Sequence, residues 1–195
     1  MNRVLFSLIL CCLFFIFIQM VIKRQTDKSN NSNYVVLRKY DGFEVRSYPE
    51  LFVATTKLAS SDYDGNSGEG FRRIANFIFG GNDRNQKIAM TSPVLMDMKD
   101  SVEMSFIMPE GIEELNAPKP DNTGVYLEKR PAKTVAVLTF GGWASTNKIL
   151  EKKEELLQLL NKHQLKYSGI ITYMGYNPPY QVVDRRNEVA VSIEW

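Results

Sequence analysis

The feature that most constrains the fold of this chain is an internal repeat that occupies residues 34–195. In the first copy a strand-like segment, Pro49 and a second strand-like segment follow one another, and the same order recurs around Pro131 in the second copy. Each copy continues with a helical pattern and two closing strands, which in the first copy are residues 88–96 and 103–108. The sequence therefore predicts the order β-β-α-β-β twice.

Each copy contains one predicted amphipathic helix. Two glycines at residues 80–81 are expected to end the first helix, and Ser145 or Thr146 can cap the start of the second. The segment 65–68 resembles a nucleophile elbow, but Glu69 stands where that motif requires glycine, so we predict a loop. The apolar stripes are Phe71, Ile74, Ala75 and Ile78 in the first helix and Ile149, Leu156 and Leu160 in the second.

Two amphipathic helices packed on a largely antiparallel sheet would bury the hydrophobic faces of both, which predicts an α+β domain. The pattern alone does not distinguish two stacked sheets from a distorted barrel. A polar segment, residues 110–124, connects the two copies. Because a pseudo-twofold fold usually leaves a groove between its halves, we expect a ligand to bind there.

Residues 4–22 are almost continuously apolar and, as a helix, would extend about 28 Å, close to the thickness of a bilayer's hydrocarbon core. Residues 18–22 contain no pair of small residues for a signal peptidase, which favours an uncleaved anchor over a cleaved signal peptide. Lipid modification of Cys11 or Cys12 is a further alternative. The flanking Lys and Arg residues do not set an orientation. The predicted organisation is a membrane anchor over residues 1–24, a flexible linker over residues 25–33 and one domain over residues 34–195.

The net charge of the chain and the positions of its cysteine and histidine residues argue against several classes of protein. The formal net charge is only +2, which argues against a nucleic-acid partner. Both cysteines lie in the apolar run, where they can form neither a disulfide framework nor a spaced metal site. The single histidine, His163, lies near the end of the second helix, where a structural role is commoner than ligation. We therefore expect a protein that is not an enzyme.

Aromatic and basic residues are interleaved on the first helix, and the loop before the last strand carries aromatic rings with hydroxyl groups. Arg72, Arg73 and Phe79 share the first helix, and Tyr176 and Tyr180 flank a proline pair before the last strand. Apolar walls for the ring faces and Arg or Tyr donors for the propionates are what a planar porphyrin requires. Taken singly, each of these aromatic residues belongs more often to the core than to a ligand site.

Four ordered segments together resemble the SOUL haem-binding family, and the likeness covers residues 34–195. That resemblance implies a distorted antiparallel β-barrel flanked by two helices, and non-enzymatic binding of haem or a related tetrapyrrole in a shallow hydrophobic cleft. The segments are YVVLRKYDGFEVRSYP, IANFIFGGNDRNQKIAMTSPVLM, VAVLTFGGWAS and GYNPPYQVVDRRNEVAVSIEW.

The resemblance also implies that the first helix, residues 71–79, and the loop at residues 176–181 form the cleft walls. Some family members supply a histidine ligand at the first helix, and this chain has none there. A methionine, a tyrosine or His163 would have to ligate the iron, and the axial ligand stays unassigned. The cofactor-binding residues implied are Arg72, Arg73 and Tyr176 for the propionates or ring edge, and Ala75, Asn76, Phe79 and Tyr180 for the walls.

Three functions follow from these patterns. The first is haem buffering or transport beside a membrane. The second is a sensor or effector-binding module for other amphipathic small molecules, because the two-repeat fold resembles bacterial effector-binding domains. The third is an interaction or scaffold role, or an enzymatic activity that none of these motifs indicates. The side of the membrane, the oligomeric state and any protein partner are left open.

Overall fold

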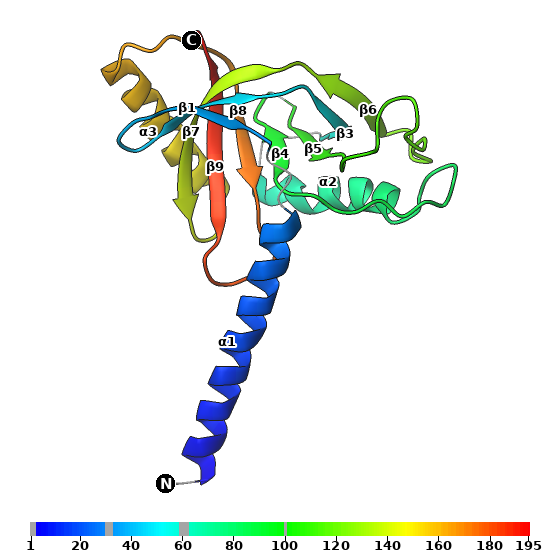
Figure 1. Cartoon of the computed structure of the whole chain (residues 1–195), viewed down its shortest axis with the longest axis vertical. Helices are drawn as coiled ribbons and strands as arrows, with labels where there is room; N and C mark the ends of the chain where they lie inside the picture. The colour runs from blue at the N-terminus through cyan, green and yellow to red at the C-terminus, as the bar shows by residue number, and fades with distance from the viewer. Residues whose placement is uncertain (1–2, 30–32, 59–62, 100) are drawn as a thin grey trace.

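A long N-terminal helix extends away from a domain of strands and two further helices (Figure 1). The computed structural model describes residues 3–29, 33–58, 63–99 and 101–195. In chain order the elements are α1 (Arg3–Ser29), β1 (Val35–Lys39), β2 (Glu44–Tyr48), β3 (Leu51–Lys57), α2 (Tyr63–Ile78), β4 (Val94–Asp97), β5 (Glu103–Ile107), β6 (Val125–Arg130), β7 (Lys133–Gly141), α3 (Thr146–Lys162), β8 (Tyr167–Gly175) and β9 (Arg186–Ile193).

The strands form one sheet in the order β1-β2-β7-β9-β8-β4-β5-β3-β6, and every neighbouring pair is antiparallel. The two predicted repeats are β2-β3-α2-β4-β5 and β6-β7-α3-β8-β9, with β1 as an additional edge strand. Each half is completed by the first strand of the other half, since β2 pairs with β7 and β6 pairs with β3. The α+β prediction is confirmed. The sheet keeps two edges, β1 and β6, so its closure into a barrel is not confirmed.

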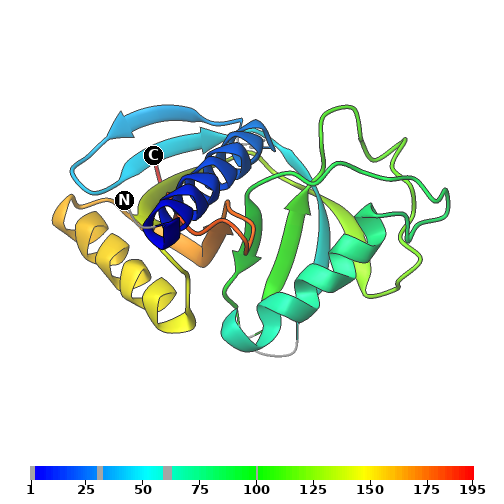
Figure 2. The same ribbon diagram turned by 90° about the horizontal axis from the view of Figure 1, so that it is seen from below.

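Both domain helices cover the same face of the sheet, α2 over the β3–β5 half and α3 over the β7–β9 half (Figure 2). Because side chains alternate along a strand, Val189 and Val191 of β9 join this main core, whereas Glu188 and Ala190 lie on the opposite face. Phe77 of α2 is fully buried in the main core. The face without these two helices carries a smaller apolar cluster and most of the buried charges.

The predicted loop at residues 65–68 is wrong, because α2 begins at Tyr63 and includes it. Two tertiary contacts support these extra turns. The Asp64 carboxylate accepts hydrogen bonds from the backbone N–H (3.1 Å) and the hydroxyl (2.9 Å) of Thr146. At Gly70 an added Cβ would lie 2.9 Å from Leu58 Cδ1, so glycine allows the helix to approach the sheet closely.

Other boundaries follow the sequence more closely. The Ser145 side chain caps α3 by accepting a hydrogen bond from the Lys148 N–H at 3.3 Å, as predicted. The predicted strand over residues 88–96 is too long, because the continuous strand begins only at Val94, after Pro93, which has no N–H to donate to a neighbouring strand.

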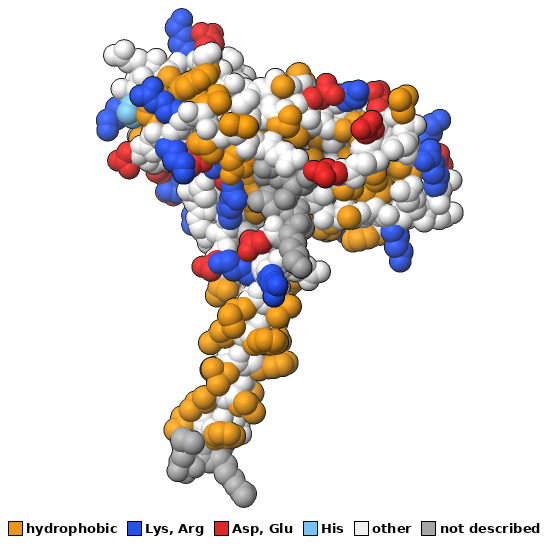
Figure 3. Space-filling model, in the orientation of Figure 1, with side chains coloured by type: hydrophobic (Ala, Val, Ile, Leu, Met, Phe, Trp, Pro, Cys, Tyr) orange, Lys and Arg blue, Asp and Glu red, His pale blue; other side chains and the backbone are white. Residues whose placement is uncertain are grey.

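Helix α1 continues to Ser29, so residues 25–29 of the predicted linker are helical, and residues 30–32 lie outside the described part of the chain. The side chains of residues 5–18 are exposed and almost all hydrophobic, which gives the projecting helix a continuous apolar surface (Figure 3). Its segment Leu5–Asp27 is long and apolar enough to cross a membrane, although a signal sequence meets the same criterion.

Candidate ligand-binding site

The predicted residues of α2 form an exposed stripe. Arg72, Asn76 and Phe79 lie at positions i, i+4 and i+7, and the Phe79 side chain is 60% exposed. The Arg72 Nε donates to the Gly68 carbonyl at 3.3 Å, within the helix. Arg73 is more constrained, since it pairs with Glu69 and donates to a carbonyl of β3.

Two of the predicted residues are buried instead. Ala75 packs on the core side of α2. The Tyr176 ring is only 5% exposed, and its hydroxyl donates to Glu188 Oε2 at 2.7 Å. By contrast, Tyr180 is 64% exposed on the loop between β8 and β9. A contact of Ala75 or the Tyr176 hydroxyl with a ligand would therefore require local rearrangement.

The N-terminal end of α2 is the end that approaches β8. The rings of Tyr63 and Tyr173 meet edge to face with centroids 5.1 Å apart. Phe79 lies just beyond the other end of the helix, about 24 Å along its axis from Tyr63. The structure thus brings the first half of α2, and not Phe79, towards the strand that leads into the predicted loop wall.

Arg185 organises that loop, which here means residues 177–185. Its guanidinium donates to the carbonyls of Pro178 (2.9 Å) and Gln181 (2.6 Å), and lies 4.1 Å from the centre of the Trp143 ring. Burial lowers the pKa of Arg185, although a nearby Tyr173 opposes that shift. The sequence analysis did not assign a role to Arg185 or Trp143, because both depend on a contact between β7 and β9 loops that only the folded sheet creates.

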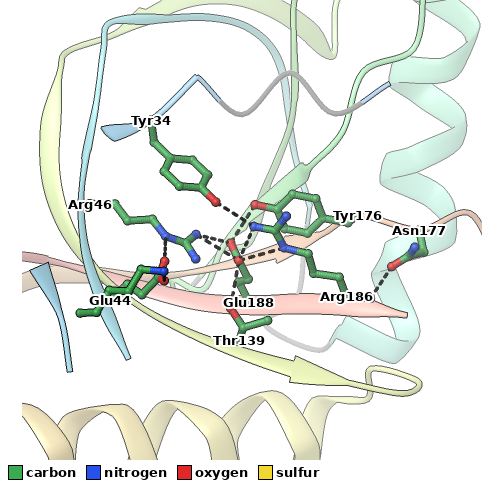
Figure 4. Close-up of polar contacts among 9 residues, drawn as sticks. Tyr34, Glu44, Arg46, Thr139, Tyr176, Asn177, Arg186 and Glu188 are labelled. Atoms are coloured by element: carbon green, nitrogen blue, oxygen red, sulfur yellow. Dashed lines mark hydrogen bonds and ion pairs between the residues drawn. The ribbon is translucent and has the colours of Figure 1, made fainter. Parts of the chain in front are cut away.

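On the other face of the sheet, Glu188 is the centre of a buried ionic network (Figure 4). Arg46 Nη1 lies 3.0 Å from both carboxylate oxygens, and Arg186 donates to Oε1 through Nε (3.1 Å) and Nη2 (2.7 Å). The Thr139 hydroxyl donates to the same oxygen at 3.1 Å. The carboxylate is thereby saturated by partners from β2, β7, β9 and the loop that follows β8.

Aromatic rings cover the two arginines of this network. Arg46 lies 4.3 Å from the centre of the Tyr34 ring, and Arg186 lies 4.0 Å from that of Tyr176. Burial lowers the pKa of each guanidinium, but Glu188 together with the neighbouring tyrosines, and Glu44 in the case of Arg46, raises it above its ordinary value, so both remain charged. At the edge of the network, burial raises the pKa of Glu44, but Arg46 and Lys39 hold it below its ordinary value.

The single histidine, the acidic side chains and a surface hollow at α3 are the other features that could hold a ligand or a metal ion. The His163 ring packs against Tyr40 and Phe43, with centroids 4.8 and 5.7 Å away, so it lies at the end of α3 and not beside α2. Among the described residues no cluster of three His, Cys, Asp or Glu side chains could hold a metal ion. A shallow, open hollow between the end of β7 and the first turns of α3 is lined largely by polar groups, including Lys148 and Lys152.

A family model described as SOUL heme-binding protein matches residues 29–192, which include the loop, the network and both domain helices. The chain belongs to this family. Among its curated relatives, mouse heme-binding protein 2 is 28% identical to this chain over 156 residues, which cover 75% of this chain and 76% of that protein. Heme-binding protein 1 of Xenopus laevis is 26% identical over 172 residues, covering 83% and 90% respectively.

Solved structures with the same fold are more distant in sequence. The C-terminal domain of EcmrR matches with a TM-score of 0.61 at 11% identity, over 83% of this chain and 98% of that domain. An uncharacterized conserved protein from Listeria innocua matches with a TM-score of 0.58 at 10% identity, covering 78% and 92%. These similarities show that the chain shares its two-repeat fold with these proteins. They do not indicate which ligand it binds.

Proposed function

We propose that the domain binds haem or a related tetrapyrrole without catalysing a reaction, and that it buffers or transports this ligand beside a membrane to which α1 tethers it. The observation that carries the proposal is the family match across residues 29–192, together with relatives that are named heme-binding proteins. The cleft would lie between the outer side of α2 and the loop at residues 177–185.

The side chains at these two walls fit a porphyrin. Arg72 supplies an exposed guanidinium for a propionate, and Tyr180 and the partly exposed Phe71 supply aromatic surface for the ring. Haem would contribute its own iron chemistry, and the protein would contribute orientation and charge pairing. His163 packs elsewhere, so an axial ligand would have to be a methionine or a tyrosine.

The ionic network bears on the alternative, a sensor or effector-binding module for other amphipathic small molecules, in the case in which such a molecule is cationic. A buried cation would require a carboxylate that is not already paired. Glu188 already accepts hydrogen bonds from Arg46, Arg186, Thr139 and Tyr176. Its interactions are those of a structural ion cluster, and they resemble neither a vacant cation site nor a nucleophile with its base.

The proposed tether rests on α1. In water, this helix would expose the apolar side chains of residues 5–18. Insertion into a bilayer removes that surface from water. The tether would keep the cleft close to a lipid phase in which an apolar macrocycle dissolves.

Titration of the full chain, held in detergent micelles, with haemin tests the binding proposal. We expect a saturable Soret band at micromolar haemin, and weaker binding by severalfold in Arg72→Ala and Tyr180→Ala variants. Arg38→Ala is the matched control, because Arg38 is an exposed arginine on the edge strand β1. Phe79→Ala shows whether the far end of α2 takes part.

The absence of a saturable spectral change would refute tetrapyrrole binding. A saturable change that Arg38→Ala weakens as much as Arg72→Ala would mean that the ligand binds through non-specific charge and not at the proposed cleft. Flotation of the chain with lipid vesicles tests the tether separately, since haemin binding does not depend on it.

A further inference from the structure

We propose that the domain has a second membrane contact, in which Tyr180, Val182 and Val183 of the loop, together with Trp143, lie in the bilayer interface beside α1. These four residues form what we call the interfacial surface. The inference rests on the proposed tether, and it adds that the domain is held against the lipid instead of moving freely at the end of a linker. Its partner is the lipid bilayer itself.

The length of α1 that is free of the domain supports the contact. Residues 5–18 are exposed along the projecting part of the helix (Figure 1), and they extend only about 21 Å. A bilayer's hydrocarbon core is about 30 Å thick. The projecting part is therefore too short by about 9 Å, and tilting would shorten its reach further. For α1 to span the core, the lipid must extend past residue 18 to the level at which the loop begins.

Gln19 lies at that level and is, with Ser7, one of two polar residues in the apolar run. It is only 4% exposed, because its side-chain amide accepts a hydrogen bond from the Val182 N–H (2.9 Å) and donates to the Tyr180 carbonyl (3.4 Å). Backbone groups that enter an apolar phase must be paired. Gln19 pairs two such groups at the tip of the loop, which suits this loop to a position about 4.5 Å inside the end of the apolar run at Ile22.

Further contacts fix the loop along one side of the helix. The Lys23 ammonium lies 2.6 Å from Asp184 Oδ2, and the Thr26 hydroxyl donates to Gln181 Oε1 at 2.9 Å. Together with Gln19, these residues lie at i, i+4 and i+7, so they form a single stripe on α1. The contacts of Lys23 and Thr26 lie on the domain side of the stripe, and the Gln19 contact lies on the lipid side. In a bilayer, the first two would lie at the level of the headgroups and the third at the edge of the hydrocarbon core.

The side chains on the outer side of the loop are apolar and aromatic. Tyr180 is 64%, Val182 49% and Val183 45% exposed, and Trp143, whose ring contacts the Arg185 guanidinium at the end of the loop, is 54% exposed. Both views show the β8–β9 loop at the base of the domain next to α1 (Figures 1 and 2). Tyr and Trp are enriched at membrane interfaces, where an aromatic ring meets both lipid and water. Apolar side chains of interfacial segments enter lipid by about 5–10 Å, a depth that closes the gap in the length of α1.

Depth-dependent fluorescence quenching in vesicles tests the proposal with the full chain. The protein has two tryptophans, and Trp195 is at the end of the domain away from α1 (Figure 1). Trp195→Phe leaves Trp143 as the reporter, and Trp143→Phe leaves Trp195 as an internal control. Val182→Trp in a background without either native tryptophan reports on the loop tip. We expect phosphatidylcholine spin-labelled near the headgroup end of its acyl chain to quench positions 143 and 182 at least threefold more than position 195.

Charge at the loop tip gives an independent check. Val182→Asp combined with Val183→Asp is expected to reduce the quenching of Trp143 at least twofold, because carboxylates resist entry into the interface. Leu115→Asp is the control, since Leu115 is exposed in the connector between β5 and β6, away from α1. If the chain floats with vesicles but all three positions are quenched equally weakly, the interfacial surface is wrong and the tether stands. If the chain does not float with vesicles, both proposals are overturned.

Discussion

Replacement of Glu188 by glutamine tests how much the buried network contributes to stability. The carboxylate is fully buried and, among the described residues, accepts six hydrogen bonds from four side chains. Glutamine has a similar size but removes the negative charge, which leaves the buried Arg46 and the partly exposed Arg186 as neighbouring cations. Removal of one partner from a buried ion pair costs about 3–5 kcal/mol. For a domain of this size that loss corresponds to a melting temperature lower by about 6–20 °C.

Thermal unfolding of the full chain in detergent, followed by circular dichroism, measures this loss. Glu194→Gln provides the control on the same segment, because that side chain is exposed and its nearest cation, Lys166 Nζ, is 3.9 Å away. Its free energy of unfolding is expected to change by less than about 0.5 kcal/mol. A Glu188→Gln variant within about 1 kcal/mol of the parent would refute the view that the network holds β2, β7 and β9 together.

Three further measurements probe local features. Burial, with a contribution from Glu188, raises the pKa of Tyr48 to about 12, so the folded state keeps a proton that the unfolded chain releases above pH 10, and stability should fall between those two pH values. Tyr48→Phe should remove that alkaline loss, which urea titrations at pH 8 and pH 11 would measure; an equal loss in the variant would assign it to another group. Gly68→Ala should raise stability by about 0.5–1 kcal/mol, since the position is helical and an added Cβ meets nothing within 4 Å; destabilisation would contradict the helical start of α2. Ser145→Ala should cost about 1 kcal/mol through loss of the α3 cap, and an unchanged melting temperature would show that the cap is dispensable.

The loop between β8 and β9 connects the two proposals. The loop supplies one wall of the proposed tetrapyrrole cleft through Tyr180, and it supplies the backbone groups that Gln19 pairs. A ligand that leaves or enters the cleft would then do so at the surface of the bilayer. The haemin titration in micelles and the quenching measurement in vesicles separate the two roles, because each has its own reporter.

Much of the fold follows from local patterns in the sequence. Prolines that separate strands, glycines after a helix and a serine before one act within a few residues, so they determined the repeat, the end of α2 and the cap of α3. The apolar run at residues 4–22 similarly determined that α1 is a long hydrophobic helix. Where local signals misled, as at residues 65–68, contacts from α3 and β3 outweighed the low helical propensity of glycine.

The tertiary structure alone decided what the polar and aromatic side chains do. The sequence predicts that Tyr176 contacts a ligand. In the fold, its hydroxyl instead donates a hydrogen bond to Glu188 of β9, and both side chains are buried. Gln19 and Val182 are 163 residues apart along the chain, and no local pattern indicates their hydrogen bond. The periodicity of apolar residues indicates which side of a helix or strand faces the core. Contacts between distant elements depend instead on how strands are exchanged between the two halves of the sheet. The sequence thus determined the family, the repeat and the apolar helix, and the packing of the β8–β9 loop determined where a ligand and a membrane would meet.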